Sequence, residues 1–525
     1  MMPKSYNAFW ITALLIAAGV DFLFWGKPVG VSFPIWTLLA ISGALFLNFR
    51  HGSHPARANI VLGGIILALA SLTFLRAEPL TAALGLLLAL AALMLWAVTL
   101  PNGHWLYYTL WDTLRAVTIL VFAALTRSFT LLTSRDDPPE KQQASPLSRQ
   151  GWAVLRGILL ALPVVGLLAL LLASADLVFA QRLHLALDAL RLEKLPETLF
   201  RLFYIGVLTF IFCGVLLHAV FPAHEVKPSP KESRFLSPFL GWTESSILLG
   251  SVNALFLFFV ILQFRYLFGG QANIHEAGFT YAEYARRGFG ELVWVAIITL
   301  SLILTLHTIS RRNTTTRQRV FVALNVLLIA LVLVILASAY QRLILYEQAY
   351  GFTRLRTYTY LFIPWLGLLL LTVSGLILSN QMRRMGFALI FFALGFGLLL
   401  GIWNVDGWVA RQNIQRALNG QELDGDYLQT LSADAVPDLI RLAQQNQLPA
   451  SARTEILIGL ACRAGQPSPD NLPWQSFNLS QHRAASLLAA NAGLWQDYIV
   501  QQDRNGMYVL HNGQRRYCGY AERFD

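Results

Sequence analysis

The stretch VFVALNVLLIALVLVILASAYQR, residues 320–342, decides the fold of this chain. It carries no charge before Arg342, and as a helix it is long enough to cross a hydrocarbon core of about 30 Å. Backbone groups inside lipid must hydrogen-bond to one another, which forces such a run to be helical. The stretch therefore predicts a membrane-spanning helix.

Similar apolar runs occur along most of the chain. The predicted spans are 8–26, 29–49, 60–75, 79–100, 152–174, 199–222, 243–268, 288–310, 320–342, 358–379 and 386–403. The composition agrees, because 56% of residues are hydrophobic and only 13% are charged, against about 25% charged in a soluble globular protein. We therefore expect an all-α polytopic membrane protein with about eleven transmembrane helices.

Residues 105–133 are the ambiguous piece. Asp112, Arg115 and Arg127 leave only a short uncharged stretch between the two arginines. Such a segment more often lies in the membrane interface than across the bilayer. The alternative is a twelfth span in which Asp112 pairs with Arg115.

The chain divides into four parts by composition. Residues 1–133 form an amino-terminal membrane group, 134–150 a polar cytoplasmic linker, 151–403 the main membrane domain, and 404–525 a small soluble domain, called the tail below. The tail is predicted to be mainly helical, with Ser432 or Asp434 as a helix cap and Pro437 in a first turn. Asn512-Gly513 predicts a terminal β-hairpin.

The distribution of Lys and Arg favours a cytoplasmic amino terminus, although the bias is modest. An odd number of spans then places the tail outside, in the periplasm of a diderm cell. Cys462 and Cys518 are the two cysteines of the tail. On the oxidising side of a membrane they would form a disulfide, and in a cytoplasmic domain they would be free, buried thiols.

Two segments rich in Tyr, Glu and Arg face the same side in this topology, and they are the candidate binding residues. The first segment, 269–287 with Glu291 shortly after it, and the second, 342–357, supply Tyr281, Glu283, Tyr284, Arg286, Arg287, Glu291, Arg342, Tyr346, Glu347, Arg354 and Arg356. In the structural interpretation, Glu and Arg pair with each other, as Glu283 and Arg287 can at a spacing of four in a helix. In the functional interpretation, the arginines form a pocket for an anion such as a lipid phosphate.

Several stretches resemble one bacterial family of polytopic membrane proteins that is known only as a domain of unknown function. They are QFRYLFGG at 263–270, TYAEYARRGFGELV at 280–293, RLILYEQAYGFTRLRTYTY at 342–360, VARQNIQRAL at 409–418, LDGDYLQTLSADAVPDL at 423–439 and WQSFNLSQHRAA at 474–485. The resemblance runs from about residue 160 to the end. It implies a bacterial inner-membrane protein and assigns no reaction.

The sequence holds no spacing typical of a catalytic or metal site. His275 and Glu276 are neighbours, but no HxxxH, HExxH or CxxC pattern accompanies them, so we expect no metal and no cofactor. The net charge of +11 is interpreted as loop cations near anionic headgroups, and nucleic-acid binding is not expected. Membrane lipids and another envelope or membrane protein are the expected partners.

Two functions remain open from the sequence. The first is a non-enzymatic envelope, assembly or sensory-partner protein that uses an outward-facing Tyr/Glu/Arg cluster. The second is a transferase or transporter for a lipid-linked or other anionic substrate, with an acid such as Asp21 or Glu283 as base. A filled, salt-bridged cluster would favour the first function, and an open cavity joining an acid to the arginines would favour the second.

Overall fold

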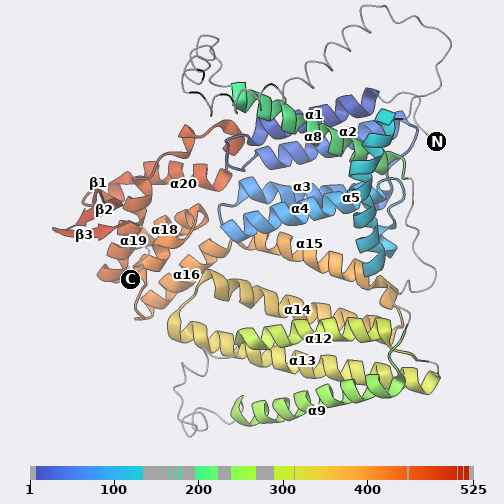
Figure 1. Cartoon of the computed structure of the whole chain (residues 1–525). Coiled ribbons are helices and arrows are strands. Elements are labelled where there is room, and N and C mark those ends of the chain that lie inside the picture. Colours follow the sequence, from blue (N-terminus) through green and yellow to red (C-terminus); the bar gives the residue numbers. More distant parts are fainter. Residues whose placement is uncertain are drawn as a thin grey trace, which may run out of the picture. The chain divides into compact units, whose positions relative to one another are not determined.

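Figure 1 shows the computed structural model of the chain. It describes residues 7–133, 195–222, 238–267, 289–312, 314–445, 448–504, 506–511 and 513–518, and single positions at 165, 172, 176 and 179. Within these ranges the protein is helical up to Ala490, and strands occur only near the carboxy terminus.

The described residues contain ten helices that are long and apolar enough to cross a membrane. They are α1 (Asn7–Phe24), α2 (Ser32–Arg50), α3 (Arg57–Leu75), α4 (Pro79–Thr99), α8 (Leu195–Val220), α9 (Trp242–Leu267), α12 (Phe289–Ile309), α13 (Thr315–Tyr350), α14 (Arg354–Leu378) and α15 (Met385–Trp403). Each matches a predicted span, so the polytopic all-α fold is confirmed. The predicted span 152–174 and the linker 134–150 lie outside the described residues.

Residues 105–133 fold as a short 3-10 turn, η1 (His104–Tyr107), and one continuous helix, α5 (Leu110–Thr133). The Thr109 hydroxyl accepts from the Asp112 backbone N–H, and the Asp112 carboxylate accepts from the Thr109 backbone N–H, which is a capping box. The ten candidate spans do not include α5, and its place in the interface stays a prediction.

The chain packs as two compact units. The first unit comprises residues 1–22 and 121–221. In it, Arg127 of α5 donates to the Leu217 carbonyl of α8 over 2.9 Å. Asp21 of α1 accepts from Arg201 Nε of α8 over 2.8 Å and also from the Tyr204 hydroxyl. The acid that the sequence offered as a possible base is therefore held in an ion pair that joins two spans.

The second unit holds the other spans and the tail. Helices α9, α12, α13 and α14 share one apolar core around Leu328, Val332 and Leu370. The mid-span polar groups of α9 support this packing: Asn253 donates to the Leu324 carbonyl over 3.1 Å, and Gln263 accepts from Ser338 over 2.8 Å. Interhelical hydrogen bonds of this kind hold membrane helices together, because lipid gives no hydrophobic drive for their association.

The tail begins directly at the end of α15. Asn404 is the one residue between α15 and α16 (Val405–Leu418), and it lies in the left-handed region at φ +49° while its side chain caps the Gly407 N–H. The next elements are α17 (Gly425–Thr430), η4 (Ala433–Ala435), α18 (Val436–Ala443), α19 (Ala450–Ala464), η5 (Pro469–Asn471), η6 (Trp474–Ser476), α20 (Leu479–Ala490) and η7 (Ala492–Trp495). No linker therefore separates the last span from the tail.

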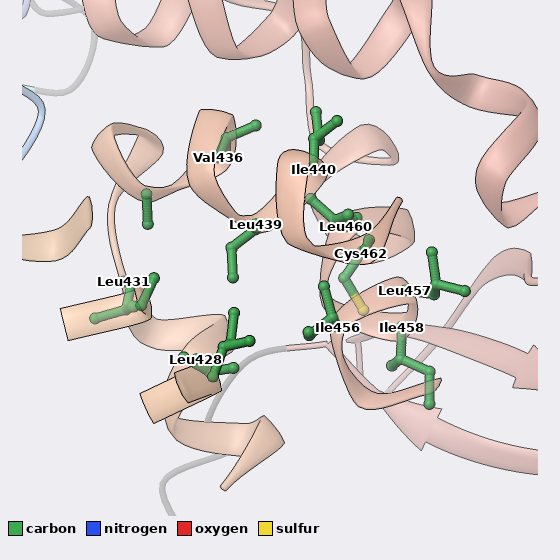
Figure 2. Packing of buried hydrophobic residues seen from close by; sticks show 14 of the residues in the cluster. Leu428, Leu431, Val436, Leu439, Ile440, Ile456, Leu457, Ile458, Leu460 and Cys462 are labelled. Carbon is green, nitrogen blue, oxygen red and sulfur yellow. The ribbon is translucent and has the colours of Figure 1, made fainter. Parts of the chain in front are cut away.

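The tail has its own apolar core. Side chains of α17, α18 and α19, among them Leu428, Leu439 and Leu460, point toward one another in Figure 2. The chain ends in a three-stranded antiparallel sheet of β1 (Ile499–Asp503), β2 (Gly506–His511) and β3 (Gln514–Tyr517). The β2–β3 hairpin is the predicted one, with Gly513 at φ +78°, and β1 is a third strand that the sequence analysis missed.

The structure joins Cys462 of α19 to Cys518, directly after β3, in a disulfide. The bond links the sheet to the helical core, and the Cα atoms of the two cysteines lie 5.5 Å apart. The remaining cysteine, Cys213, is buried in α8.

Candidate functional site

The second signature segment, 342–357, consists of two helix ends joined by a tight turn. Helix α13 runs to Tyr350, α14 starts at Arg354, and only residues 351–353 connect them. Gly351 has φ +79°, a left-handed conformation that favours glycine. Asn413 of α16 pairs with the backbone of Phe352, donating to its carbonyl and accepting from its N–H over 2.8 Å each. The turn is thereby fixed to the tail.

Arg354, the first residue of α14, is used inside the protein. Its Nε and a terminal nitrogen donate to the two carboxylate oxygens of Asp406, each over 2.7 Å, and the same terminal nitrogen donates to the Thr430 carbonyl over 2.8 Å. Asp406 is fully buried and also accepts from the Ser432 N–H. A bidentate guanidinium–carboxylate pair is among the stronger polar contacts. It joins a membrane helix to three elements of the tail.

The short turn between α3 and α4 makes a second contact with the tail. Asp434 accepts from the backbone N–H groups of Ala77 and Glu78 over 2.9 Å each. Arg76 lies 3.9 Å from the other oxygen of Asp434 and donates to the Gly401 carbonyl over 2.7 Å. Ser432, rather than Asp434, caps the following turn. The carboxylate of Asp434 therefore serves the contact with the membrane helices.

Glu78 closes this network from the membrane side. It is buried, it caps α4 by accepting from the N–H groups of Leu80 and Thr81, and it accepts from the hydroxyl of Tyr358, one turn after Arg354 in α14. We call the six residues Arg76, Glu78, Arg354, Tyr358, Asp406 and Asp434 the docking cluster. It connects α3, α4 and α14 to the tail through paired charges.

Arg463 of α19 supports the docking cluster from the tail side. It donates to the carbonyls of Leu428, Leu431 and Ser432 over 3.0, 2.7 and 3.0 Å. Burial lowers the pKa of Arg463 to about 10, with Asp406 acting in the opposite direction, so the guanidinium remains charged at neutral pH. With Arg463 included, the described residues place three arginines and three carboxylates in this region.

Two other arginines lack such a partner. Arg356 lies 4.0 Å from the centroid of the Tyr346 ring and donates to the Gly351 carbonyl. Arg416 donates to the Glu347 carbonyl over 2.6 Å, and its pKa is lowered by burial and by the charge of Arg356. Neither arginine has a carboxylate within 4 Å among the described residues. Glu347 is buried, and its Oε1 has no hydrogen-bond partner there. We call Arg356, Arg416 and Glu347 the corner.

The predicted binding residues thus have different outcomes. Arg354 belongs to the docking cluster, Arg356 and Glu347 form the corner, and Tyr346 stacks under Arg356. Arg342 is half-buried in α13, and Glu291 is exposed in the first turn of α12. The following residues lie outside the described part of the chain: Tyr281, Glu283, Tyr284, Arg286, Arg287, His275 and Glu276. Their pairing with the second segment stays a prediction.

A family model described as a domain of unknown function (DUF4153) matches residues 63–442, which is more than half of the chain. The chain belongs to the DUF4153 family. No curated protein and no solved structure matches it. The matched region begins inside α3, earlier than the resemblance near residue 160 indicated, and ends inside α18.

All six residues of the docking cluster lie within the DUF4153 region, and so does the corner. The disulfide and the sheet follow it. Because the family region extends into the tail as far as α18, the contact between spans and tail is internal to the DUF4153 domain.

Sequence reasoning missed most of the docking cluster, namely Arg76, Glu78, Tyr358, Asp406 and Asp434. A signal was present for two of them, because Arg76 and Glu78 interrupt the apolar sequence at the only turn between α3 and α4. Asp406 was hidden because it follows the last span by three residues, where a charge at a helix start is ordinary.

Proposed function

We propose that this membrane protein is a non-enzymatic component of the bacterial inner membrane, an envelope-assembly or sensory-partner protein. Its working surface is the tail, held in a fixed position on the ends of the spans. The observation that carries the proposal is the Arg354–Asp406 pair. Arg354, which could have bound an anion, instead pairs with a carboxylate of the tail, as expected for a structural cluster.

We further propose that the amino terminus is cytoplasmic and that the tail lies in the periplasm. The disulfide supports this orientation, because such bonds persist on the oxidising side of a membrane. The cations at the helix ends of the second unit give modest further support, because cytoplasmic helix ends carry more Lys and Arg. The helix ends away from the tail carry Arg50, Arg57, Arg311, Arg312, Arg317, Arg319, Arg383 and Arg384. The helix ends next to the tail carry Lys27, Arg76, Arg265, Arg342, Arg354 and Arg356.

The partners proposed for this function are membrane lipids and a second envelope or membrane protein. A photo-crosslinking amino acid at Gln415, which is exposed on the tail, tests the protein partner in intact cells. We expect a discrete crosslinked protein band that Arg354→Ala abolishes. Arg411→Ala is the matched control, because it removes an Arg–Asp pair that lies wholly within the tail, and the band should persist.

The corner favours a second candidate function, a transferase or transporter for a lipid-linked anionic substrate. Arg356 and Arg416 are two half-buried cations without a carboxylate partner among the described residues, and the buried Glu347 stands beside them. Arginines of this kind suit a phosphate. A polyprenyl pyrophosphate titrated into nanodiscs that contain the full chain tests this function.

The two candidates give different results in that titration. Saturable binding that is lost in Arg356→Ala/Arg416→Ala and retained in Arg411→Ala, together with no crosslinked partner on the tail, would replace the first candidate by the second. Crosslinking without saturable binding would retain the first. Glu347→Gln then separates the roles within the corner, because it removes the acid and leaves both arginines in place.

A further inference from the structure

The segment Leu472–Leu479 reverses the usual burial of side chains. Gln475, Ser476 and Asn478 are buried, at 5%, 4% and 6% exposure. Leu472, Trp474 and Leu479 are 43%, 54% and 44% exposed. Single exposed apolar residues are ordinary on a soluble surface. Three of them alternating with buried polar residues in one short segment indicate a surface whose surroundings are not water.

The buried polar side chains explain why the segment holds this orientation. Ser476 Oγ donates to the Pro28 carbonyl over 2.9 Å. Asn478 Nδ2 donates to the carbonyls of Thr73 and Arg76 over 3.2 and 2.8 Å. All three acceptors lie at span ends, just before α2 or at the end of α3. The polar side chains of the segment are therefore bonded to the ends of the membrane helices, and Leu472, Trp474 and Leu479 remain exposed.

Backbone contacts fix the position of the segment next to the start of α2. The Val31 N–H, at the start of α2, donates to the Phe477 carbonyl over 2.9 Å. Gly30 packs so closely that a Cβ there would lie 2.6 Å from the Phe477 carbonyl oxygen. The 3-10 turn η6 brings the Trp474 carbonyl within 3.0 Å of the Phe477 N–H. Trp474 is thus tied to the level at which α2 begins.

The span ends to which the segment is bonded also expose apolar side chains. Val29 and Ile35, on either side of Val31, are exposed, and so is Leu75 at the end of α3. On membrane-spanning helices such side chains face lipid. Trp is enriched at the boundary between hydrocarbon and headgroups, because its ring is apolar and its N–H is polar. The acid at the start of the segment, Asp470, lies 3.3 Å from His482 Nε2, so it has a partner within the tail.

We propose that Leu472, Trp474 and Leu479 form a lipid-inserted foot, through which the tail rests in the interfacial layer of the bilayer next to α2 and α3. The occupant of this surface is the lipid interface, rather than a second copy of the chain or a soluble partner. Together with the docking cluster, the foot holds the tail against the membrane at two separate places.

Nitroxide labels on the full chain test the foot. The labels are placed by Leu472→Cys, Trp474→Cys or Leu479→Cys in a Cys213→Ala background, without reductant, so that the disulfide stays closed. Ile499→Cys is the matched control, because Ile499 is exposed and apolar but lies on β1, away from the span ends. The chain is reconstituted in nanodiscs of phosphatidylethanolamine and phosphatidylglycerol, one copy per disc. Collision with oxygen reports lipid, and collision with a water-soluble nickel complex reports water.

We expect the ratio of oxygen to nickel collisions at the three foot positions to exceed the ratio at Ile499 several-fold. Equal ratios at the foot and at Ile499 would overturn the proposal, because they would show the foot to be in water. Low collision with both reagents at the foot would also overturn it, because protein would then cover the surface. An intact Cys462–Cys518 disulfide on a non-reducing gel confirms that each labelled chain has folded.

Discussion

Arg354 and Arg356 stand two residues apart at the start of α14, yet they lie in different surroundings. Arg354 is paired with a buried carboxylate in the docking cluster, and Arg356 stacks on Tyr346 at the corner, without a carboxylate within reach among the described residues. Residues at spacing two point to different sides of a helix. Two arginines that form one motif in the sequence therefore have different partners in the structure.

Arg354→Ala should have the largest effect on this comparison. It leaves Asp406 buried without its cation, and breaking a buried pair in this way costs about 3–5 kcal/mol. Backbone amides of α16 and α17 should therefore exchange hydrogen faster than in the unaltered chain, measured in nanodiscs. Arg411→Ala is the control, since Arg411 is exposed and the buried Asp438 keeps Arg441 at 3.5 Å, so the variant does not leave a buried carboxylate without a cation and should cost less. Similar exchange in both variants would mean that the docking cluster does not hold the tail.

Cys462→Ser/Cys518→Ser removes the disulfide and leaves the docking cluster in place, so it separates the folding of the tail from its docking on the spans. The disulfide closes a loop across a sequence separation of 56, and the loss of such a bond costs about 2–4 kcal/mol. We expect faster exchange in the sheet and α19, with α14 and the start of α16 still protected. The prediction fails if the docking contacts open together with the sheet.

Tyr358→Phe tests the membrane side of the docking cluster. The variant removes one donor from the buried Glu78 carboxylate, which still accepts from Leu80 and Thr81. The loss of one hydrogen bond to a charged group costs about 1.5–3 kcal/mol, so exchange at the start of α4 and α14 should rise less than in Arg354→Ala. A neutral result would show that the Tyr358 hydroxyl does not stabilise the cluster.

Arg356→Ala should have the smallest effect. It removes a cation–π contact with Tyr346 and a bond to the Gly351 carbonyl, and an exposed cation–π contact is worth about 0.5–1 kcal/mol. Thermal unfolding of the full chain in detergent should therefore change little. A loss as large as that of Arg354→Ala would make the corner as structural as the docking cluster, and the second candidate function would lose its support.

Much of the fold could be predicted from local sequence. Each described span follows from an apolar run of sufficient length, because the bilayer demands satisfied backbone bonds within each segment. The hairpin followed from Asn512-Gly513, since its turn needs residues that tolerate positive φ. Strand β1, IVQQD, was missed because its polar residues give no alternation, and it becomes a strand only by pairing with β2.

The candidate site was predicted only in part. Residue types and their places at span ends pointed to Arg354, Arg356 and Glu347, but they did not identify any partner. Glu78 and Tyr358 are 280 positions apart in the chain, and Asn478 and Thr73 are 405 apart. Contacts at such separations leave no periodic pattern in the sequence, because they depend on which helices become neighbours.

The sequence by itself determined that this chain is a multispanning helical membrane protein with a small tail, because hydrophobic length and turn chemistry act locally. Only the tertiary structure decided that Arg354 pairs with Asp406, that Arg356 has no carboxylate partner within the described residues, and that Trp474 is exposed while its neighbour Gln475 is buried. These outcomes depend on the rotation of each helix about its axis and on the contact between span ends and tail. Both are set by the packing of the whole unit and by no single segment.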